Sequence, residues 1–191
     1  MNTILNRSAV FELGSTSTAF CNFAFVDCEN DKWFRLFDGR SHVEHWTAVG
    51  ITAADEPDDT AELGDFALLG TIPVLSARAL RALSSLLEKR AELLPLRYPR
   101  REYSALNVLR TIDALDEDSS ELERFDSGRV MAVNRFSFKA ERLQDEIIFR
   151  IPQLQRGHVF VTDRFVDSVR QHELMGFSFK QVWSSTDARA A

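Results

Sequence analysis

Short apolar runs separated by polar residues fill the first part of the chain and predict strands. Residues 19–26 (AFCNFAFV) and 33–37 (WFRLF) are rich in strand-forming side chains, and the second run ends at an Asp-Gly pair, residues 38–39, typical of hairpin turns. In residues 43–49, the set Val43, His45, Thr47 and Val49 alternates with Glu44, Trp46 and Ala48, which predicts a half-buried strand. A polar loop with Pro at its centre, residues 55–59, follows. This region is therefore expected to be mostly β.

The next segment predicts a strand region and then a helix. Residues 66–75 are mainly apolar, and Ser76 stands at an N-cap position before apolar residues that recur at helical spacing. Pro95 disfavours helical geometry in the residue before it. We therefore expect this helix to end near Leu94.

Strand-like runs continue to the end of the chain, with one more helix among them. The runs cover residues 103–112, 130–138, 147–151, 158–161 and 177–183. Between the last two runs, Thr162 or Asp163 is expected to cap a helix that Gly176 closes.

Strands that precede, separate and follow only two clear helices do not show the alternation of a doubly wound fold. The sequence therefore predicts an α+β fold with a mainly antiparallel or mixed sheet and two principal helices. Its 191 residues suit one domain or a tightly joined pair. We expect a mostly β region over residues 1–70 and an α+β region over residues 71–185, packed together as one compact unit.

The aromatic composition points to a core rather than to a cofactor site. Phe occurs 15 times and Tyr only twice. A Phe ring has no polar group and is best used by burial, whereas an aromatic cofactor site favours Tyr or Trp. No cofactor is expected.

Charge is distributed unevenly along the chain, whose formal net charge is −6. Residues 1–75 carry 12 acidic and 4 basic side chains, and residues 76–191 carry 17 acidic and 19 basic ones. An acidic half repels phosphate groups, so neither nucleic acid nor an anionic membrane is an expected partner. It suits a basic partner protein, although an acidic surface also serves solubility alone.

The sequence carries no catalytic or metal-binding signature. His42 and His45 would point to opposite faces of the strand expected there, so they do not predict a zinc site. An acidic segment over residues 113–126 fails as a calcium loop, because Glu121 stands where the turn Gly belongs and Ser127 where the bidentate Glu belongs. The sequence also lacks the nucleophile-elbow, P-loop and dinucleotide-turn patterns. We expect neither catalytic residues nor a bound metal.

Cysteine usage and hydropathy bear on the compartment. Cys21 and Cys28 fit neither a close zinc pair nor a redox pair, and suggest reduced thiols. No apolar run approaches the roughly 20 residues of a membrane span, and residues 1–14 lack the apolar core of a secretory signal. The protein is expected to act in the cytoplasm.

Two acidic clusters supply the candidate partner-binding residues. They are Asp55, Glu56, Asp58 and Asp59 in the polar loop, and Asp116, Glu117 and Asp118 in the acidic segment. Complementary charge raises the rate and selectivity of association, so both clusters would suit a partner with a basic surface. The alternative for the second cluster is a solvated loop or the start of a helix.

A series of motifs in the second part of the chain resembles a known bacterial family. In order, they are Pro-Val-Leu-Ser before the first helix, Leu-Leu-Pro after it, Leu-Asn-Val-Leu at 106–109, Asp-Ala-Leu-Asp at 113–116, Phe-x-Phe at 136–138, Ile-Phe-Arg-Ile-Pro at 148–152, Phe-Val-Thr-Asp-Arg-Phe-Val at 160–166 and Gly-Phe-x-Phe at 176–179. Their order and spacing between Ile72 and Trp183 are similar to those of the immunity-protein-eleven family of polymorphic toxin systems.

The resemblance implies that the protein neutralises a cognate toxin and so protects the producing cell and its kin. It implies no catalytic residues, and because the motifs are mostly apolar we expect them in the core. Specificity would then lie in the acidic loops and the N-terminal region. Two other classes stay open: an enzyme acting on a small molecule or nucleotide with a site assembled from distant residues, and a binding or scaffold module unrelated to toxins.

Overall fold

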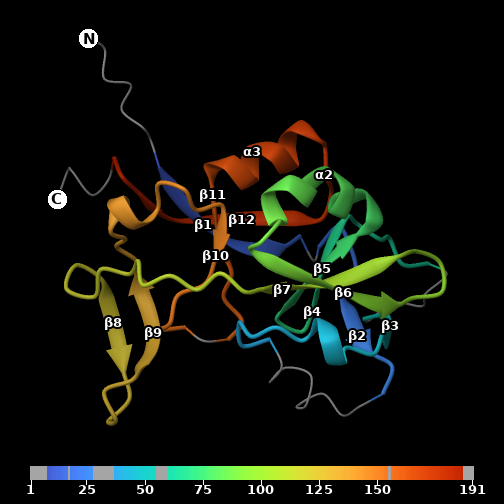
Figure 1. The fold of residues 1–191 in the computed structure, drawn as a ribbon, viewed down its shortest axis with the longest axis horizontal. Helices are drawn as coiled ribbons and strands as arrows, with labels where there is room; N and C mark the ends of the chain where they lie inside the picture. Colours follow the sequence, from blue (N-terminus) through green and yellow to red (C-terminus); the bar gives the residue numbers. More distant parts are fainter. Residues whose placement is uncertain (1–7, 17, 28–36, 55–59, 155, 187–191) are drawn as a thin grey trace.

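The computed structural model describes residues 8–16, 18–27, 37–54, 60–154 and 156–186, which form an α+β fold (Figure 1). Helices α2 (Ala77–Leu87) and α3 (Asp163–Gln171) contact each other and lie on the same side of the strands. The strands form a closed barrel, a four-stranded sheet and a two-stranded hairpin. The predicted class, with antiparallel and mixed pairing and two principal helices, is confirmed.

Six strands close the barrel in the order β2-β3-β6-β7-β5-β4. They are β2 (Phe23–Phe25), β3 (Val49–Ala53), β4 (Phe66–Leu69), β5 (Ile72–Ser76), β6 (Ala91–Arg97) and β7 (Tyr103–Val108). The parallel pair of Phe23 with Leu69 joins β2 to β4 and completes the ring. Side chains alternate between the inside and the outside of a barrel, and the interior cluster includes Ile51, Leu94 and Tyr103.

The four-stranded sheet brings together segments from both ends of the chain. Its strands are β1 (Ala9–Ser15), β10 (Ile148–Phe149), β11 (Phe160–Thr162) and β12 (Phe177–Ser184), in the order β10-β11-β1-β12. All three pairings are antiparallel. β1, from the start of the chain, therefore lies between two strands from its end (Figure 1).

The two faces of this sheet enter different hydrophobic clusters. On one face, Val161 and Phe177 join a cluster shared with both helices. On the other, Phe160 and Trp183 pack against Phe138, with ring centroids 5.8 and 6.0 Å from that of Phe138. Adjacent residues of a strand point to opposite faces, so the sequence Phe160-Val161 supplies one side chain to each cluster.

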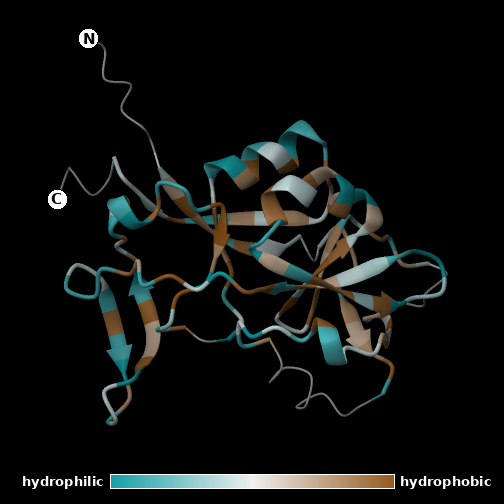
Figure 2. Cartoon of the chain, in the orientation of Figure 1, coloured by the Kyte–Doolittle hydropathy of each residue, from teal (hydrophilic) through white to brown (hydrophobic). Residues whose placement is uncertain are grey.

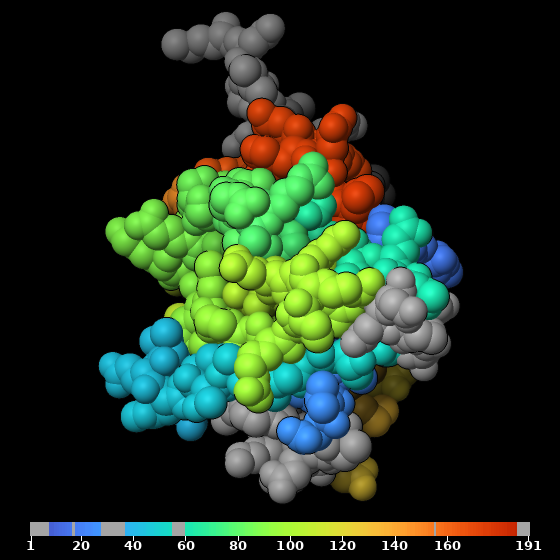
Figure 3. All heavy atoms as spheres, turned by 90° about the vertical axis from the view of Figure 1, so that its right-hand side faces the viewer, coloured from blue at the N-terminus to red at the C-terminus, as the bar shows by residue number. Residues whose placement is uncertain are grey.

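Helix α2 connects the barrel to this sheet. Its buried residue Leu83 belongs to the cluster that also contains Leu75 and Leu106 of the barrel and Val161 of the sheet. An amphipathic helix is stabilised when its apolar face is buried, and α2 buries that face against both the barrel and the four-stranded sheet. At the barrel end of the molecule, the outer surface includes α2, the strands β6 and β7, and the segment with the short helix η1 (Val43–His45) (Figure 3).

The third β unit is a hairpin of β8 (Glu121–Arg124) and β9 (Val130–Arg135), which extends from the body at the end opposite the barrel (Figure 1). Hydrophobic and hydrophilic positions are interleaved along both strands (Figure 2). Another short helix, η2 (Ala140–Arg142), follows the hairpin.

The strand predicted for residues 43–49 is wrong: η1 occupies residues 43–45, and β3 begins at Val49. The backbone N–H of His42 donates to Glu92 over 2.8 Å, and Trp46 Nε1 donates to the carbonyl oxygen of Pro95 over 2.8 Å. These bonds hold the segment against β6, so it curls instead of extending. Within the predicted run 19–26 only β2 is a strand, and residues 33–36 lie outside the described residues.

The first helix ends at Leu87, not near Leu94. Lys89 adopts a φ of +61°, which reverses the chain, and β6 begins at Ala91. Leu94 instead alternates with exposed neighbours in β6 and is fully buried inside the barrel. Pairing with β7 therefore overrides the helical spacing of the local sequence.

The second helix starts after Thr162, as predicted, but Gly176 does not close it. The helix ends at Gln171, and Glu173 takes the left-handed conformation with a φ of +50°. Gly176, with a φ of +93°, stands at the entry to β12 against the backbone of Phe66. It is needed for close packing of the backbone rather than for ending the helix.

Candidate partner-binding surface

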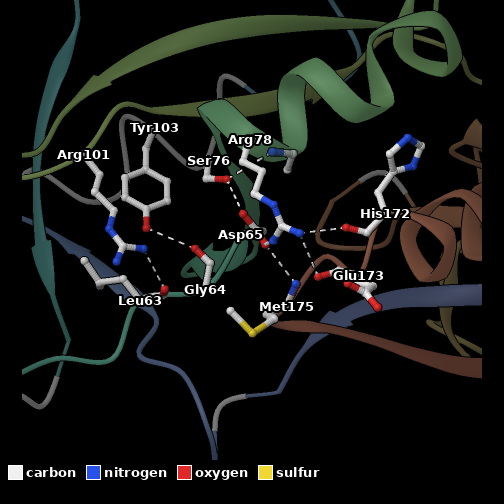
Figure 4. Close-up of polar contacts among 11 residues, drawn as sticks. Leu63, Gly64, Asp65, Ser76, Arg78, Arg101, Tyr103, His172, Glu173 and Met175 are labelled. Carbon is white, nitrogen blue, oxygen red and sulfur yellow. Dashed lines mark hydrogen bonds and ion pairs between the residues drawn. The ribbon is translucent and has the colours of Figure 1, made fainter.

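A buried polar cluster around Asp65 is the first arrangement that could carry chemistry (Figure 4). Asp65 is 6% exposed. Its Oδ1 accepts from Ser76 Oγ over 2.8 Å, and its Oδ2 accepts from Arg78 Nη1 over 2.6 Å and from the backbone N–H of Met175 over 3.0 Å. These three protein donors satisfy both oxygens of the carboxylate.

The remaining contacts of this cluster are also structural. Arg78 Nη2 donates to the carbonyl oxygens of His172 and Glu173 over 2.8 and 3.2 Å, which ties α2 to the turn after α3 (Figure 4). Tyr103 Oη donates to the carbonyl oxygen of Gly64 over 3.1 Å. The cluster therefore joins the barrel to the four-stranded sheet, and we assign it to the scaffold.

The first acidic cluster of the sequence, Asp55, Glu56, Asp58 and Asp59, lies outside the described residues. The second cluster occupies the turn before β8. Asp116 is half-buried and bonded through its backbone to Ser137, whereas Asp118 is exposed. Part of the acidic segment, for which a solvated loop or the start of a helix was the alternative, is this turn, and the following residues 121–124 form strand β8.

Glu117, the middle residue of this turn, is bonded inside the protein. Its Oε2 lies 2.6 Å from Arg124 Nη2, and its Oε1 accepts from Gln153 Nε2 over 2.8 Å. The hydrogen bond from Arg124, with a smaller one from Gln153, lowers the pKa of the Glu117 carboxyl. A general acid needs a raised pKa, so this shift is that of a structural ion pair.

A groove of about 570 Å³ opens beside this ion pair. One wall is formed by residues 124, 125 and 128–131 around the tip of the β8–β9 hairpin, and the other by residues 152–154, 156 and 158 of the later loop. Phe125 and Met131, large apolar side chains in the first wall, are 43% and 48% exposed. We call this feature the hairpin groove.

Basic side chains predominate in the hairpin groove. Arg129 lies over the ring of Phe125, with 4.9 Å between its Cζ and the ring centroid, and Arg156 stands in the opposite wall. The carboxylate of Glu117 is balanced by Arg124, which also donates to the carbonyl oxygen of Gly128 over 3.0 Å. The groove is therefore locally positive on a chain whose net charge is negative.

His158, at the inner end of the groove, pairs with Glu12 of β1. Its Nδ1 lies 2.6 Å from Glu12 Oε1. The hydrogen bond from His158 lowers the pKa of Glu12 against the opposing effect of burial, and the charges of His158 and Lys180 add to the lowering. This pair fixes the start of β11 to the centre of the sheet.

Sequence reasoning missed the hairpin groove. Phe125 stands among charged and polar residues, and this was the available signal, since exposed aromatic, Met and Arg side chains are enriched at interfaces. Met131 lies inside the apolar run predicted as a strand over residues 130–138, so its neighbours in the sequence did not indicate that it is exposed. The opposite wall comes from a separate part of the chain and carries no such signal.

Within the described ranges, no three His, Cys, Asp or Glu side chains gather in a way that could hold a metal ion. His42 directly precedes the short helix η1 and His45 is its last residue, so the two do not lie on a strand, and His42 Nε2 lies 3.9 Å from Asp38 Oδ1. Cys21 is half-buried, and Cys28 lies outside the described residues.

None of the helices described here has the length and apolar character needed to cross a membrane.

The groove lies within a stretch of the chain that matches a known family model. No curated protein matches the chain. A family model does, over residues 95–184, and that stretch contains both walls of the hairpin groove and most of the four-stranded sheet. Residues 95–184 match the model of the immunity protein family Imm11, which confirms the resemblance carried by the sequence motifs.

Proposed function

We propose that this protein is an immunity protein that binds a cognate bacterial toxin in the cytoplasm of the producing cell and neutralises it. The observation that carries the proposal is the match of residues 95–184 to the immunity protein family. In this role the protein acts in competition between bacteria, as one half of a toxin–antidote pair.

The described structure supports a binding role better than a catalytic one. Three hydrophobic clusters and the Asp65 cluster give a firm scaffold, and the hairpin groove is an exposed concave surface beside a projecting element. An inhibitor of this kind needs a preorganised surface, because rigidity lowers the entropic cost of association. The ion pair of Glu117 and Arg124 supplies such rigidity at the edge of the groove.

We further propose that the acidic clusters contact a basic surface of the toxin. These residues are Asp55, Glu56, Asp58 and Asp59, together with Asp116, Glu117 and Asp118 in the turn before β8. Asp118 is the exposed member of that turn and the main candidate for the contact, whereas the charge of Glu117 is already paired with Arg124. Rim charges of this kind mainly raise the association rate and its dependence on salt.

The test of the function is co-expression with the product of the adjacent toxin-like reading frame. We expect the wild-type chain to rescue growth and to co-purify with the toxin in a stoichiometric complex. Rescue without a complex would instead indicate an enzyme that removes the toxin's product. Toxicity that the chain does not relieve would overturn the proposal.

The test of the acidic contacts is charge reversal. Replacing Asp55, Glu56, Asp58 and Asp59 together by Lys is expected to slow association with the toxin and to weaken its salt dependence. A smaller effect in the same direction is expected for Asp118→Lys, with Asp167→Lys on the exposed side of α3 as the control. Unchanged affinity and salt dependence in both sets would show that these residues are not part of the interface.

A further inference from the structure

The hairpin groove is the feature of the described surface that most resembles a binding site, and it differs in charge from the acidic clusters. We propose that it receives an acidic segment of the toxin, with an apolar side chain of that segment packed on Phe125 and Met131. This inference rests on the proposed function and names the face and the chemistry of the contact.

The apolar part of the argument comes from exposure. Among the described residues, six large hydrophobic side chains are substantially exposed. Val26, Val43, Leu93 and Met175 lie elsewhere, whereas Phe125 (43%) and Met131 (48%) both line this one groove. Exposed large apolar side chains gathered in a concave, partly polar surface are typical of the anchor positions of protein interfaces.

The charged part of the argument fixes the class of partner. Arg129 lies over the ring of Phe125 in one wall of the groove, and Arg156 lines the other wall. In the part of the chain that the structure describes, no carboxylate forms an ion pair with either guanidinium. A guanidinium binds a carboxylate through two parallel hydrogen bonds. Two guanidinium groups beside the exposed side chains of Phe125 and Met131 therefore fit an acidic segment that also carries a hydrophobic residue.

The two walls are linked without the partner. Arg124 of the hairpin holds Glu117, and Glu117 in turn accepts from Gln153 of the opposite loop over 2.8 Å. The charges of Glu117 and Arg124 thus offset each other, so Arg129 and Arg156 set the sign of the groove. A segment binding there meets a surface already in place, which reduces the cost of ordering side chains.

The experiment measures toxin affinity and protection for variants of each wall. Phe125→Ser and Arg129→Glu change the hairpin, and Arg156→Glu changes the opposite loop. Each is expected to weaken binding by about tenfold or more, as for central interface residues. Met131→Ser is paired with Met175→Ser, which removes an equally exposed methionine outside the groove (51% against 48% exposed).

Matched controls separate charge from position. Arg81→Glu, on the exposed side of α2, changes the net charge of the chain as much as Arg129→Glu does, and we expect it to leave affinity within about threefold. Arg129→Lys keeps the positive charge but loses the paired hydrogen bonds of a guanidinium, so it is expected to weaken binding less than Arg129→Glu does. If Arg129→Lys and Arg129→Glu weaken binding equally, the acidic partner segment is wrong.

The outcomes distinguish this inference from the proposed function. If the wild-type chain protects and binds while the groove variants bind equally well, the groove is not the toxin-binding face and the proposed function stands. If the wild-type chain neither protects nor binds, both are overturned. Thermal unfolding of each variant checks the fold, and Arg156→Glu tests the groove independently should the hairpin variants unfold.

Discussion

The carboxylate of Asp65 connects segments that are far apart in the sequence. It accepts from Ser76 and Arg78 at the start of α2 and from the backbone of Met175, 110 residues further along the chain. Asp65 and its donor Ser76 are both buried, 6% and 7% exposed, so removal of the carboxylate would leave the hydroxyl of Ser76 without an acceptor. An unsatisfied buried donor costs more than the hydrogen bond itself contributes.

Replacement of Asp65 by Ala should therefore lower the free energy of unfolding by about 2–4 kcal/mol, less than for a fully buried ion pair because Arg78 is partly exposed. Urea unfolding followed by circular dichroism measures it. Asp167→Ala, at an exposed position of α3, serves as the control and should change stability by less than about 0.5 kcal/mol. Equal effects of the two substitutions would contradict the role given to Asp65.

Gly176 and Gly128 form a second residue-scale test. Both have positive φ, +93° and +80°, but a Cβ at Gly176 would lie 2.3 Å from the carbonyl oxygen of Phe66, whereas a Cβ at Gly128 meets nothing within 4 Å. Gly128→Ala should cost only the backbone strain, about 1–2 kcal/mol. Gly176→Ala should cost more than about 3 kcal/mol, because the backbone must also move. Similar melting temperatures for the two variants would contradict this.

The pair of Glu12 and His158 predicts a pH effect. A carboxyl whose pKa is lowered by folding stabilises the protein above its ordinary pKa, and this contribution is lost as the pH falls through the lowered value. The His158→Ala variant should therefore have a lower free energy of unfolding than the wild type at neutral pH, and this difference should shrink as the pH falls through the lowered pKa of Glu12. Chemical unfolding of both proteins at several pH values measures the difference. A difference that grows as the pH falls through that range would contradict the prediction.

At the scale of elements, the β8–β9 hairpin is the least supported sheet. Within the described residues neither strand pairs with a third one. It is held to the body by Leu122 and Val133, which pack against the cluster around Phe138, and by the Glu117–Arg124 pair. A two-stranded hairpin is only marginally stable by itself, so this element should open more readily than the barrel.

Hydrogen exchange tests this difference. Backbone amides of residues 121–135 should exchange much faster than those of β5 and β7, which pair with neighbours on both sides in the barrel. If the hairpin groove binds the toxin, addition of toxin should slow exchange in residues 121–135 and not in α2. Equal protection of the hairpin and the barrel in the free protein would contradict the prediction.

At the scale of the whole molecule, β1 makes the two ends of the chain interdependent. It pairs with β11 on one side and β12 on the other, and Val10 is fully buried. The cluster around α2 then joins this sheet to the barrel. Each of the three hydrophobic clusters contains residues from both the region 1–70 and the region 71–185, so we expect the chain to unfold as a single cooperative unit.

A fragment of residues 71–191 should therefore fail to fold, since it lacks β1 to β4. Circular dichroism and thermal unfolding measure this directly, and a cooperative transition in the fragment would contradict it. In the full chain, Val10→Asp places a charge in the centre of the sheet and should unfold it, whereas Gln181→Asp at an exposed position of β12 should not.

The sequence by itself determined the local features that depend on neighbouring residues. Ser76 caps α2 through a hydrogen bond from the Ala79 N–H, as its position before the apolar repeat predicted. Alternating side chains at the end of the chain predicted β12, and the apolar motifs indicated the family that the comparison confirms over residues 95–184. The cap and the strand depend on spacing within one segment, where helical and extended periods differ, and the family resemblance depends on the order of motifs along the chain.

The tertiary structure alone decided what segments distant in the sequence do to one another. Pairing with β7 turned Leu94 from a helical position into a barrel strand, and contacts with β6 curled residues 43–45 into η1. The place of β1 in the sheet and the two walls of the hairpin groove likewise bring together separate parts of the chain. The physical reason is that burial and hydrogen bonding across such contacts outweigh local propensities of a few tenths of a kcal/mol per residue, roughly.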